Sequence, residues 1–199
     1  MTKSIGPWLQ HSRDTVYENP WLRLEHHSVT TPGKTEGIYG KVCFKNTAVG
    51  VVPLDDDGYT YLVGQHRYPL DSYSWEIPEG GAPLGTSPAD TARRELAEET
   101  GLRCAALYHY AQLHTSNSCT DEVADVFLAL ELTPGETAPE ETEDLQVRRL
   151  PLGEAVEMAM CGGITDALSV AALLKLRLLL DRHRGDLQSV IAAMKSCPD

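Results

Sequence analysis

The sequence predicts a protein of mixed α/β structure, closer to the α+β type than to a doubly wound fold. Its helices pack on the faces of a mixed β-sheet. Strand patterns come first: segments rich in β-branched and aromatic side chains fill most of residues 21–70. Helical patterns begin only after residue 87, and strands and helices then interleave without the regular alternation of a doubly wound sheet. We therefore expect a mixed sheet, preceded by an antiparallel strand layer in about the first forty residues.

Four strands are expected before the first helix. They lie at residues 21–29, 38–44, 47–54 and 59–68. The Asp-Asp-Asp-Gly run at 55–58 separates the last two strands and is typical of a tight turn.

The first helix has clear signals at both ends. Ser87 is followed by Pro88 and Asp90, which predicts an N-cap, a first helical residue and an acid in the first turn. Gly101 is typical of a helix end. We expect this helix to run from about Pro88 to Thr100.

Strands and helices alternate irregularly after this helix. Two strands are expected at 106–115 and 121–132, and the polar, acidic segment 133–144 indicates an exposed loop. A short strand at 145–152 and helices at 153–160 and 166–183 complete the predicted elements.

Composition excludes several classes of partner. The chain has 199 residues and a formal net charge of −12, which disfavours nucleic acid and anionic membrane surfaces because both reward basic patches. Its five cysteines are odd in number and show no C-x-x-C spacing, as expected of reduced thiols in the cytoplasm. The most apolar segment, 167–180, is too short to span a bilayer and contains Lys175 and Arg177. These features predict a soluble cytoplasmic protein.

Three glutamates concentrate negative charge on one side of the first helix. At about 100° per residue, Glu95, Glu98 and Glu99 fall within an arc of roughly 100°, beside an apolar stripe. Like charges at this spacing repel, but carboxylates on a rigid helix are ligands that Mg²⁺ or Mn²⁺ prefers. Arg94 lies one turn before Glu98, where an ion pair would orient that glutamate. A solvated acidic face is the alternative interpretation.

The stretch from residue 80 to residue 102 resembles the Nudix box. In that pattern a glycine, here Gly80, precedes an R-E-aliphatic-x-E-E-x-G-aliphatic run, which residues 94–102 match at the required spacing. One position departs, because Thr86 stands where the family has its first glutamate. The metal ligands of the family come chiefly from the later glutamates, so the resemblance implies that activity survives.

The resemblance extends from about Trp8 to Leu180, to the branch that hydrolyses ADP-ribose and nucleoside diphosphate sugars. Residues 64–81, GQHRYPLDSYSWEIPEGG, are similar to the strand and turn that lead into the box in that branch. This implies a Nudix-like α/β/α sandwich. The domains expected are a strand region at 1–45 for dimerisation and base binding, a hydrolase domain at 46–185, and a tail or short helix at 186–199.

The resemblance also implies roles for individual residues. Glu95 and Glu99 would be metal ligands, with Glu98 as a further ligand or as the neighbour that orients them, and Glu98 is also counted among the catalytic residues. The backbone carbonyl of Glu79 would complete the shell of a Mg²⁺ or Mn²⁺ ion. Substrate would be bound by Arg67 on the diphosphate, with Glu76 beside it, and by Trp21 and Tyr39 on the nucleobase.

A general base is expected on the loop after the box. Glu141 and Glu143 are the two candidates, and the resemblance does not separate them. Glu140 is a third acid in the same segment, PEETEDLQV. At least one of the three acids is expected to be merely solvated.

The leading functional hypothesis is Mg²⁺-dependent hydrolysis of ADP-ribose or a nucleoside diphosphate sugar to a nucleoside monophosphate and a sugar phosphate. ADP-ribose enzymes of the family tend to carry a proline some sixteen residues past the box, and AQLHTSNSCTDE has none. Specificity of the GDP-mannose type is therefore an alternative. A non-catalytic nucleotide-sugar sensor and an enzyme acting on damaged nucleoside triphosphates are less favoured. A homodimer is expected, because the resembling branch packs its N-terminal strands across a two-fold axis.

Overall fold

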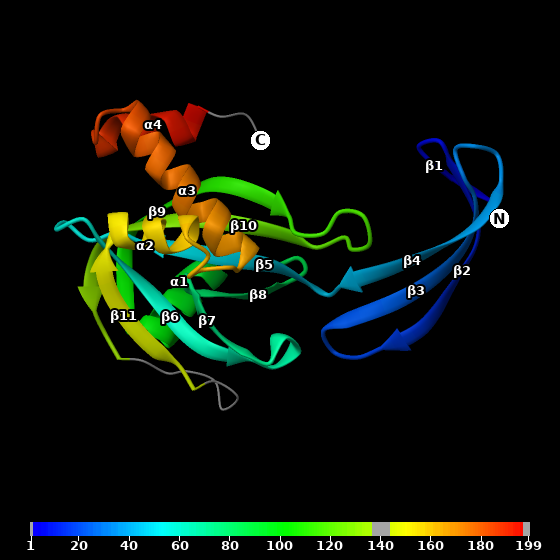
Figure 1. The fold of residues 1–199 in the computed structure, drawn as a ribbon, viewed down its shortest axis with the longest axis horizontal. Helices are drawn as coiled ribbons and strands as arrows, with labels where there is room; N and C mark the ends of the chain where they lie inside the picture. Colours follow the sequence, from blue (N-terminus) through cyan, green and yellow to red (C-terminus); the bar gives the residue numbers. More distant parts are fainter. Residues whose placement is uncertain (1, 137–143, 197–199) are drawn as a thin grey trace.

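The structure is a computed structural model that describes residues 2–136 and 144–196. An extended N-terminal sheet projects from a body in which two further sheets and four helices pack together (Figure 1). The mixed α/β class and the N-terminal antiparallel strands confirm the predicted fold class.

The N-terminal sheet is an antiparallel meander in the order β1-β2-β3-β4. Its strands are β1 (Lys3–Ile5), β2 (Trp8–Glu18), β3 (Leu22–Thr30) and β4 (Glu36–Phe44). The sequence did not predict β1 and β2. Strand β2 is exposed along most of its length and lacks an apolar alternation, so only its pairing with β3 reveals it.

Two sheets form the framework of the body. One has the order β8-β5-β10-β9 and contains the parallel pair β5 and β10, with antiparallel neighbours on both sides. The other has the order β11-β6-β7. The strands are β5 (Asn46–Pro53), β6 (Tyr59–Arg67), β7 (Ser72–Glu76), β8 (Glu79–Pro83), β9 (Leu102–His114), β10 (Val123–Pro134) and β11 (Gln146–Pro151).

Helices cover the body on two sides. They are α1 (Pro88–Thr100), α2 (Leu152–Met160), α3 (Ala167–Arg182) and α4 (Leu187–Ser196), and a short 3₁₀ helix η1 spans Tyr68–Leu70. Strand β5 explains the layering: Val49 and Val51 pack toward α1, whereas Val52 belongs to the core cluster beneath α3 and α4. Because successive strand residues face opposite sides, a strand buried on both faces becomes a continuous apolar run.

Several boundaries differ from those predicted. Strands β7 and β8 were not predicted. Pro78, Gly80, Gly81 and Pro83 are typical turn residues, so this stretch has the pattern of a loop. Strand β10 continues to Pro134 by pairing with Leu102, so the predicted loop at 133–144 begins two residues too early. The segment 186–199 contains α4, whose Val190 is fully buried in the core. Within 2–136 and 144–196, no helix is long and apolar enough to cross a bilayer.

Candidate active site

Local sequence fixes both ends of α1. Ser87 Oγ accepts a hydrogen bond from the backbone N–H of Asp90 at 3.3 Å, and Pro88 occupies the first turn. At the other end Gly101 adopts a φ of 69°, in the left-handed region, and its N–H donates to the carbonyl of Ala97 at 2.9 Å. The helix predicted at 88–100 is confirmed.

Thr86 closes the turn that leads into α1. Its hydroxyl donates to the carbonyl oxygen of Pro83 at 2.6 Å, and its backbone N–H donates to the same oxygen at 3.0 Å. The junction is thus held by a hydroxyl at the position where the Nudix box has its first glutamate.

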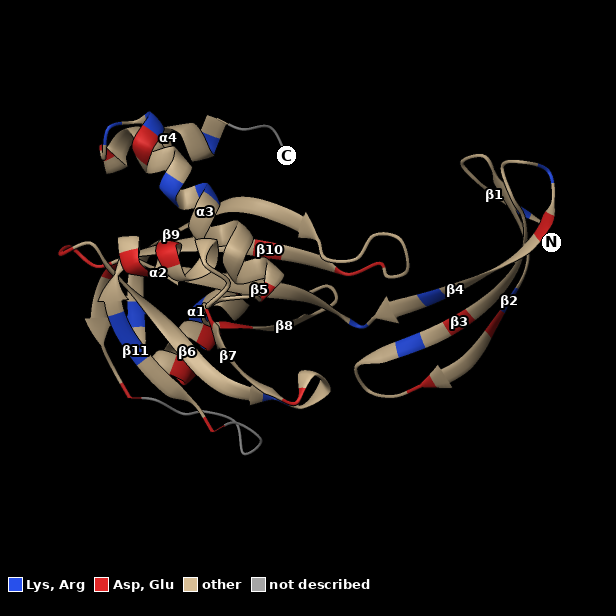
Figure 2. Cartoon of the chain, viewed as in Figure 1, with Lys and Arg blue, Asp and Glu red and all other residues tan. Residues whose placement is uncertain are grey.

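The three helix glutamates lie in different environments. Glu95 and Glu99 are buried, with exposed fractions of 8% and 2%, whereas the Glu98 side chain is 30% exposed. Arg94 bridges Glu95 and Glu98. Its Nη2 is 2.6 Å from Glu95 Oε1, and its Nη1 is 2.6 Å from Glu98 Oε2. The predicted ion pair between Arg94 and Glu98 is confirmed. Figure 2 shows α1 within the body of the protein, with the Asp and Glu positions of the cartoon coloured red.

The two buried glutamates lie against the backbone of β8. The N–H of Glu79 donates to Glu99 Oε2 at 3.0 Å. A Cβ atom added to Gly80 would lie 2.0 Å from Glu95 Oε1, which means that the Glu95 carboxylate occupies the space that only a glycine leaves open. Glu95 and Glu99, two of the residues that the resemblance assigned to the metal, therefore lie next to Glu79 and Gly80.

Replacing Gly80 by alanine should displace the Glu95 carboxylate and leave the fold in place. The clashing atoms are the far end of a flexible side chain, so we expect a small change in melting temperature. Turnover should fall on the order of 10²-fold, the cost of a misplacement of about 1 Å in an active site. Gly153→Ala is the matched control, because a Cβ there meets nothing within 4 Å. Wild-type turnover in a folded Gly80→Ala protein would contradict the arrangement.

Arg67 is held at the same place by two carboxylates. Its Nε lies 2.9 Å from Glu76 Oε1, and its Nη2 contacts both Glu76 Oε2 and, at 2.7 Å, Glu79 Oε1. Burial works against the guanidinium charge, but the bond and charge of Glu76 raise the pKa of Arg67 above its usual value. Glu76, only 3% exposed, fixes the orientation of this arginine.

Glu79, whose side chain is 15% exposed, is an additional acid at the site. Its Oε2 atom makes no hydrogen bond within the part of the chain that the structure describes. Burial raises the pKa of Glu79 well above its usual value, and the carboxylates of Asp166 and Glu76 raise it further, whereas Arg67 opposes the rise. The sequence predicted only a role for the Glu79 backbone carbonyl.

These groups open onto two adjoining cavities. One, of about 270 Å³, is lined by Arg67, Glu79 and Gly80 together with Thr115, Glu122 and Asp166. The other, of about 300 Å³, shares Arg67, Glu79 and Asp166 with the first. Sequence reasoning missed Glu122 and Asp166. Asp166 accepts a hydrogen bond from the N–H of Ser169 at 2.7 Å, so it appeared only as the start of a helix.

The donor groups fit a hard divalent cation. Among residues 2–136 and 144–196, no three His, Cys, Asp or Glu side chains converge closely enough to hold a metal ion by themselves. Glu99 nevertheless accepts the Glu79 N–H, Glu95 lies against Gly80, and Glu79 Oε2 is buried with no hydrogen bond to any described group. Carboxylate and carbonyl oxygens are the ligands that Mg²⁺ and Mn²⁺ prefer.

The hairpin loop between β9 and β10 connects this cavity to the N-terminal sheet. Thr115 and Glu122 line the cavity from the two ends of the loop. Between them, the carbonyl of Cys119 accepts a bond from Val42 N–H at 2.8 Å, and the Asp121 carboxylate lies 2.7 Å from Lys41 Nζ. Strand β4 therefore positions one wall of the cavity.

The two predicted base-binding residues are not brought together within one chain. Trp21 is 67% exposed and directly precedes β3. Tyr39 pairs with His27, whereas Leu22, next to Trp21, pairs with Phe44. Trp21 is thus six positions along the strand from the partner of Tyr39 (21 to 27), or roughly 20 Å at 3.4 Å per residue.

The predicted general bases lie outside the described residues. Glu141 and Glu143, with Glu140, fall in the segment 137–143. Their assignment stays a prediction.

The family models that match the chain cover most of its length. Residues 45–167 match the NUDIX domain. The chain belongs to the Nudix family. Residues 8–42 match the nucleoside diphosphate sugar hydrolase N-terminal domain, which supports the branch that the sequence resembled. The protein is thus a Nudix hydrolase.

Several proteins similar to this Nudix hydrolase are named for ADP compounds. An ADP-ribose pyrophosphatase of Bacillus subtilis is 36% identical over 133 residues, which cover 66% of this chain and 72% of that protein. An ADP-ribose pyrophosphatase of Mycobacterium tuberculosis is 30% identical over 167 residues, covering 82% and 80%. A crystal structure of an ADP compounds hydrolase has a TM-score of 0.81 at 23% identity, covers 92% of this chain and 99% of that one, and shows the same fold.

Proposed function

We propose that this Nudix hydrolase cleaves the diphosphate bond of ADP-ribose or a nucleoside diphosphate sugar, with Mg²⁺ or Mn²⁺, to give a nucleoside monophosphate and a sugar phosphate. The observation that carries the proposal is that Glu99 accepts the Glu79 N–H and Glu95 lies against Gly80, next to the Arg67 that pairs with Glu79. The cavity of about 270 Å³ at Gly80 is lined by Arg67 and by the acids Glu79, Glu122 and Asp166, so a guanidinium for an anionic substrate lies near carboxylates that suit a cation. The names of the relatives favour ADP-ribose.

In this proposal, different residues bind the metal ion and the diphosphate. A bound divalent cation would offset the charge of the diphosphate oxygens and lower the pKa of an attacking water. Glu95 and Glu99 would hold that cation at β8. Arg67, fixed by Glu76, keeps its Nη1 group without a hydrogen-bond partner among the described residues, so that this group remains for a diphosphate oxygen.

A carboxylate must also accept a proton. As the water oxygen bonds to one phosphorus, its proton passes to Glu141 or Glu143 in our proposal, and the P–O bond to the other phosphate breaks. The second phosphate leaves with the electron pair of that bond. Glu98, ion-paired to Arg94 at the edge of the site, is proposed as a neighbour that orients the ligands.

A substrate screen tests the proposal. ADP-ribose and about twenty nucleotide sugars would be incubated with Mg²⁺ or Mn²⁺, and both products identified by chromatography and mass spectrometry. Release of a nucleoside monophosphate with a sugar phosphate is expected. Preference for GDP-mannose over ADP-ribose would support the alternative specificity. That alternative is favoured by the absence of a proline some sixteen residues past the Nudix box. Binding of nucleotide sugars without any turnover would indicate a sensor and contradict the proposed activity.

We propose a homodimer in which the N-terminal region, residues 1–45, contributes to the partner's site. Large apolar side chains are exposed throughout this region: Ile5 46%, Val16 60%, Tyr17 56%, Trp21 67% and Ile38 72%. A sheet that leaves such groups in water is a good candidate for an interface. A second copy would also allow Trp21 and Tyr39 of different chains to contact one nucleobase.

The remaining assignments are also proposals. We assign residues 46–185 to the hydrolase domain and 186–199 to its C-terminal appendage. A cytoplasmic location is proposed because the four cysteines that the structure describes form no disulfide.

Replacing Trp21 by alanine should raise KM much more than it lowers kcat. Stacking on a base stabilises the ground state and the transition state about equally, and its loss is worth about 1–3 kcal/mol, or roughly 5- to 150-fold in KM. Steady-state kinetics would measure the effect, and Trp21→Phe should preserve most of the affinity. An unchanged KM in folded Trp21→Ala protein, or a monomer in sedimentation at micromolar concentration, would count against this arrangement.

A further inference from the structure

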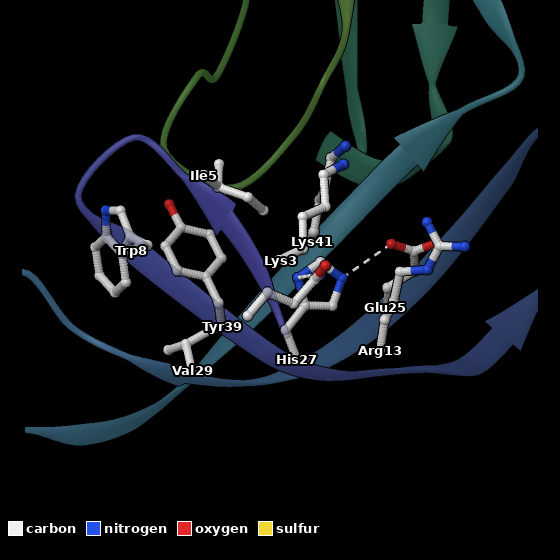
Figure 3. Close-up of a pocket in the computed structure, with 10 residues that line it drawn as sticks. Lys3, Ile5, Trp8, Arg13, Glu25, His27, Val29, Tyr39 and Lys41 are labelled. Carbon is white, nitrogen blue, oxygen red and sulfur yellow. Dashed lines mark hydrogen bonds and ion pairs between the residues drawn. The ribbon is translucent and has the colours of Figure 1, made fainter. Parts of the chain in front are cut away.

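A buried serine connects α3 to the turn that precedes the candidate metal ligands. In the N-terminal sheet, the buried polar side chains of Glu25 and His27 pair with each other within β3, with Glu25 Oε2 at 2.9 Å from His27 Nε2 (Figure 3). Ser169 instead bonds to a distant part of the chain. Its side chain is 0% exposed, and its Oγ accepts a hydrogen bond at 2.9 Å from the backbone N–H of Ile77, 92 residues away. The proposed chemistry does not use this hydroxyl.

Residues 77–79, which join β7 to β8, are held at three successive backbone groups. The Ile77 N–H donates to Ser169 of α3, and the carbonyl of Pro78 accepts a bond from β5 at 2.8 Å. The Glu79 N–H donates to Glu99 Oε2 of α1 at 3.0 Å. Because proline has no N–H, the bond from Ile77 to Ser169 is the last donor contact before Glu79. The position of the Glu79 backbone therefore depends on α3 as well as on α1.

Apolar packing holds the start of α3 against the same turn. A Cβ atom added to Gly50 of β5 would lie 2.8 Å from Ile77 Cδ1 and 2.9 Å from Leu168 Cδ2. Both side chains therefore pack on one glycine, and both are buried, with exposed fractions of 0% for Ile77 and 5% for Leu168. Ser169 directly follows Leu168, so its hydroxyl has little freedom to choose another partner.

The start of α3 also reaches the catalytic cavities. Asp166 is the N-cap of this helix and lines both cavities next to Glu79. Its Oδ2 accepts the backbone N–H of Ser169 at 2.7 Å. The Asp166 carboxylate thus fixes the backbone of Ser169, and the Ser169 hydroxyl in turn fixes the backbone of Ile77.

We propose that Ser169 is a positioning residue, which holds residues 77–79 where β8 can complete the metal site. This inference rests on the proposed function, in which a divalent cation is bound by Glu95 and Glu99 at β8. A buried N–H that loses its acceptor is costly, so without the hydroxyl the turn shifts to find another partner. A group that orients a metal ligand is worth roughly 10–100-fold in affinity, and about tenfold is expected here because Ser169 acts two residues before Glu79.

Metal affinity of the full chain is the first measurement. In a calorimetric titration, Ser169→Ala should bind Mn²⁺ about tenfold more weakly than the unaltered protein, and Ser169→Thr, which keeps a hydroxyl, should restore most of the affinity. Tyr110→Phe is the matched control. It removes another buried bond to the same helix, from the Tyr110 hydroxyl to the carbonyl of Ala172 at 3.0 Å, and should bind Mn²⁺ normally.

Amide hydrogen exchange in EDTA tests the anchoring without metal or turnover. The backbone N–H groups of Ile77 and Glu79 should exchange faster in Ser169→Ala than in the unaltered protein, because local opening of the turn becomes easier. The same two groups should exchange normally in Tyr110→Phe. Unchanged exchange at both groups in Ser169→Ala would contradict the anchoring.

The outcomes separate this inference from the proposed function. Normal Mn²⁺ affinity in folded Ser169→Ala would overturn the inference alone. An equal loss of affinity in Tyr110→Phe would also overturn it, by assigning the effect to a general loosening of α3. If the unaltered protein bound no Mn²⁺, both the inference and the proposed function would fall. Mn²⁺ binding without turnover would contradict only the proposed function, since the affinities of the variants would still be compared.

Discussion

Replacing Glu99 by glutamine is expected to abolish most metal-dependent turnover while the fold survives. A metal ion contributes several kcal/mol of charge stabilisation and each 1.36 kcal/mol is tenfold in rate, so the loss should be on the order of 10³-fold. The glutamine oxygen can still accept the Glu79 N–H bond that Glu99 Oε2 accepts at 3.0 Å. Removing one charge from a group of close carboxylates should leave stability equal or slightly higher.

Metal affinity provides a measurement that does not depend on activity. Calorimetric titration with Mn²⁺ should show much weaker binding to Glu99→Gln than to the unaltered protein, with similar melting temperatures in EDTA. Glu154→Gln, on α2 and paired with Arg148 at the surface, should bind Mn²⁺ normally. Normal Mn²⁺ affinity and normal turnover in Glu99→Gln would end its assignment as a ligand.

Glu141→Gln and Glu143→Gln should differ sharply from each other. One of them should lose turnover on the order of 10²–10⁴-fold, the contribution of a general base, and the other should change little. The chemical reason is that a glutamine amide cannot accept the proton of the attacking water. The choice between the two acids rests on the family resemblance, because both lie outside the described residues.

Saturating metal and a pH series make the comparison specific. The variant that lacks the base should lose the acidic limb of its rate profile, and Glu140→Gln from the same segment should behave as the unaltered protein. Near-normal rates in both Glu141→Gln and Glu143→Gln would place the base elsewhere, with Glu122 and Asp166 as the next acids to test because they line the cavity.

Features that depend on neighbours in sequence were predicted correctly. The ends of α1 follow from Ser87, Pro88 and Gly101, because a cap acts on backbone groups within one turn. The pairing of Arg94 with Glu98 follows from helical spacing alone. Strand β5 was visible because burial on both faces gives it a continuous apolar run from residue 48 to residue 53.

Features that depend on pairing with distant strands were not visible. Strand β2 is polar and largely exposed, and β8 contains glycines and a proline, so neither has an apolar period. Their hydrogen bonds go to β3 and β5, partners that no local pattern identifies. Register between strands is a tertiary property, since it is set by what each face buries.

The same distinction between local and tertiary features applies to the candidate site. The sequence by itself determined the chemistry: a helix with Glu95, Glu98 and Glu99, a glycine at position 80, and the family whose box they match. The tertiary structure decided which acids are buried, placing Glu95 and Glu99 against β8 and leaving Glu98 partly exposed. It also brought Asp166, 87 residues beyond Glu79 (166 − 79), to the same cavity. The physical reason is that spacing fixes which side of a helix a residue occupies, whereas burial and charge environment depend on what packs against that side.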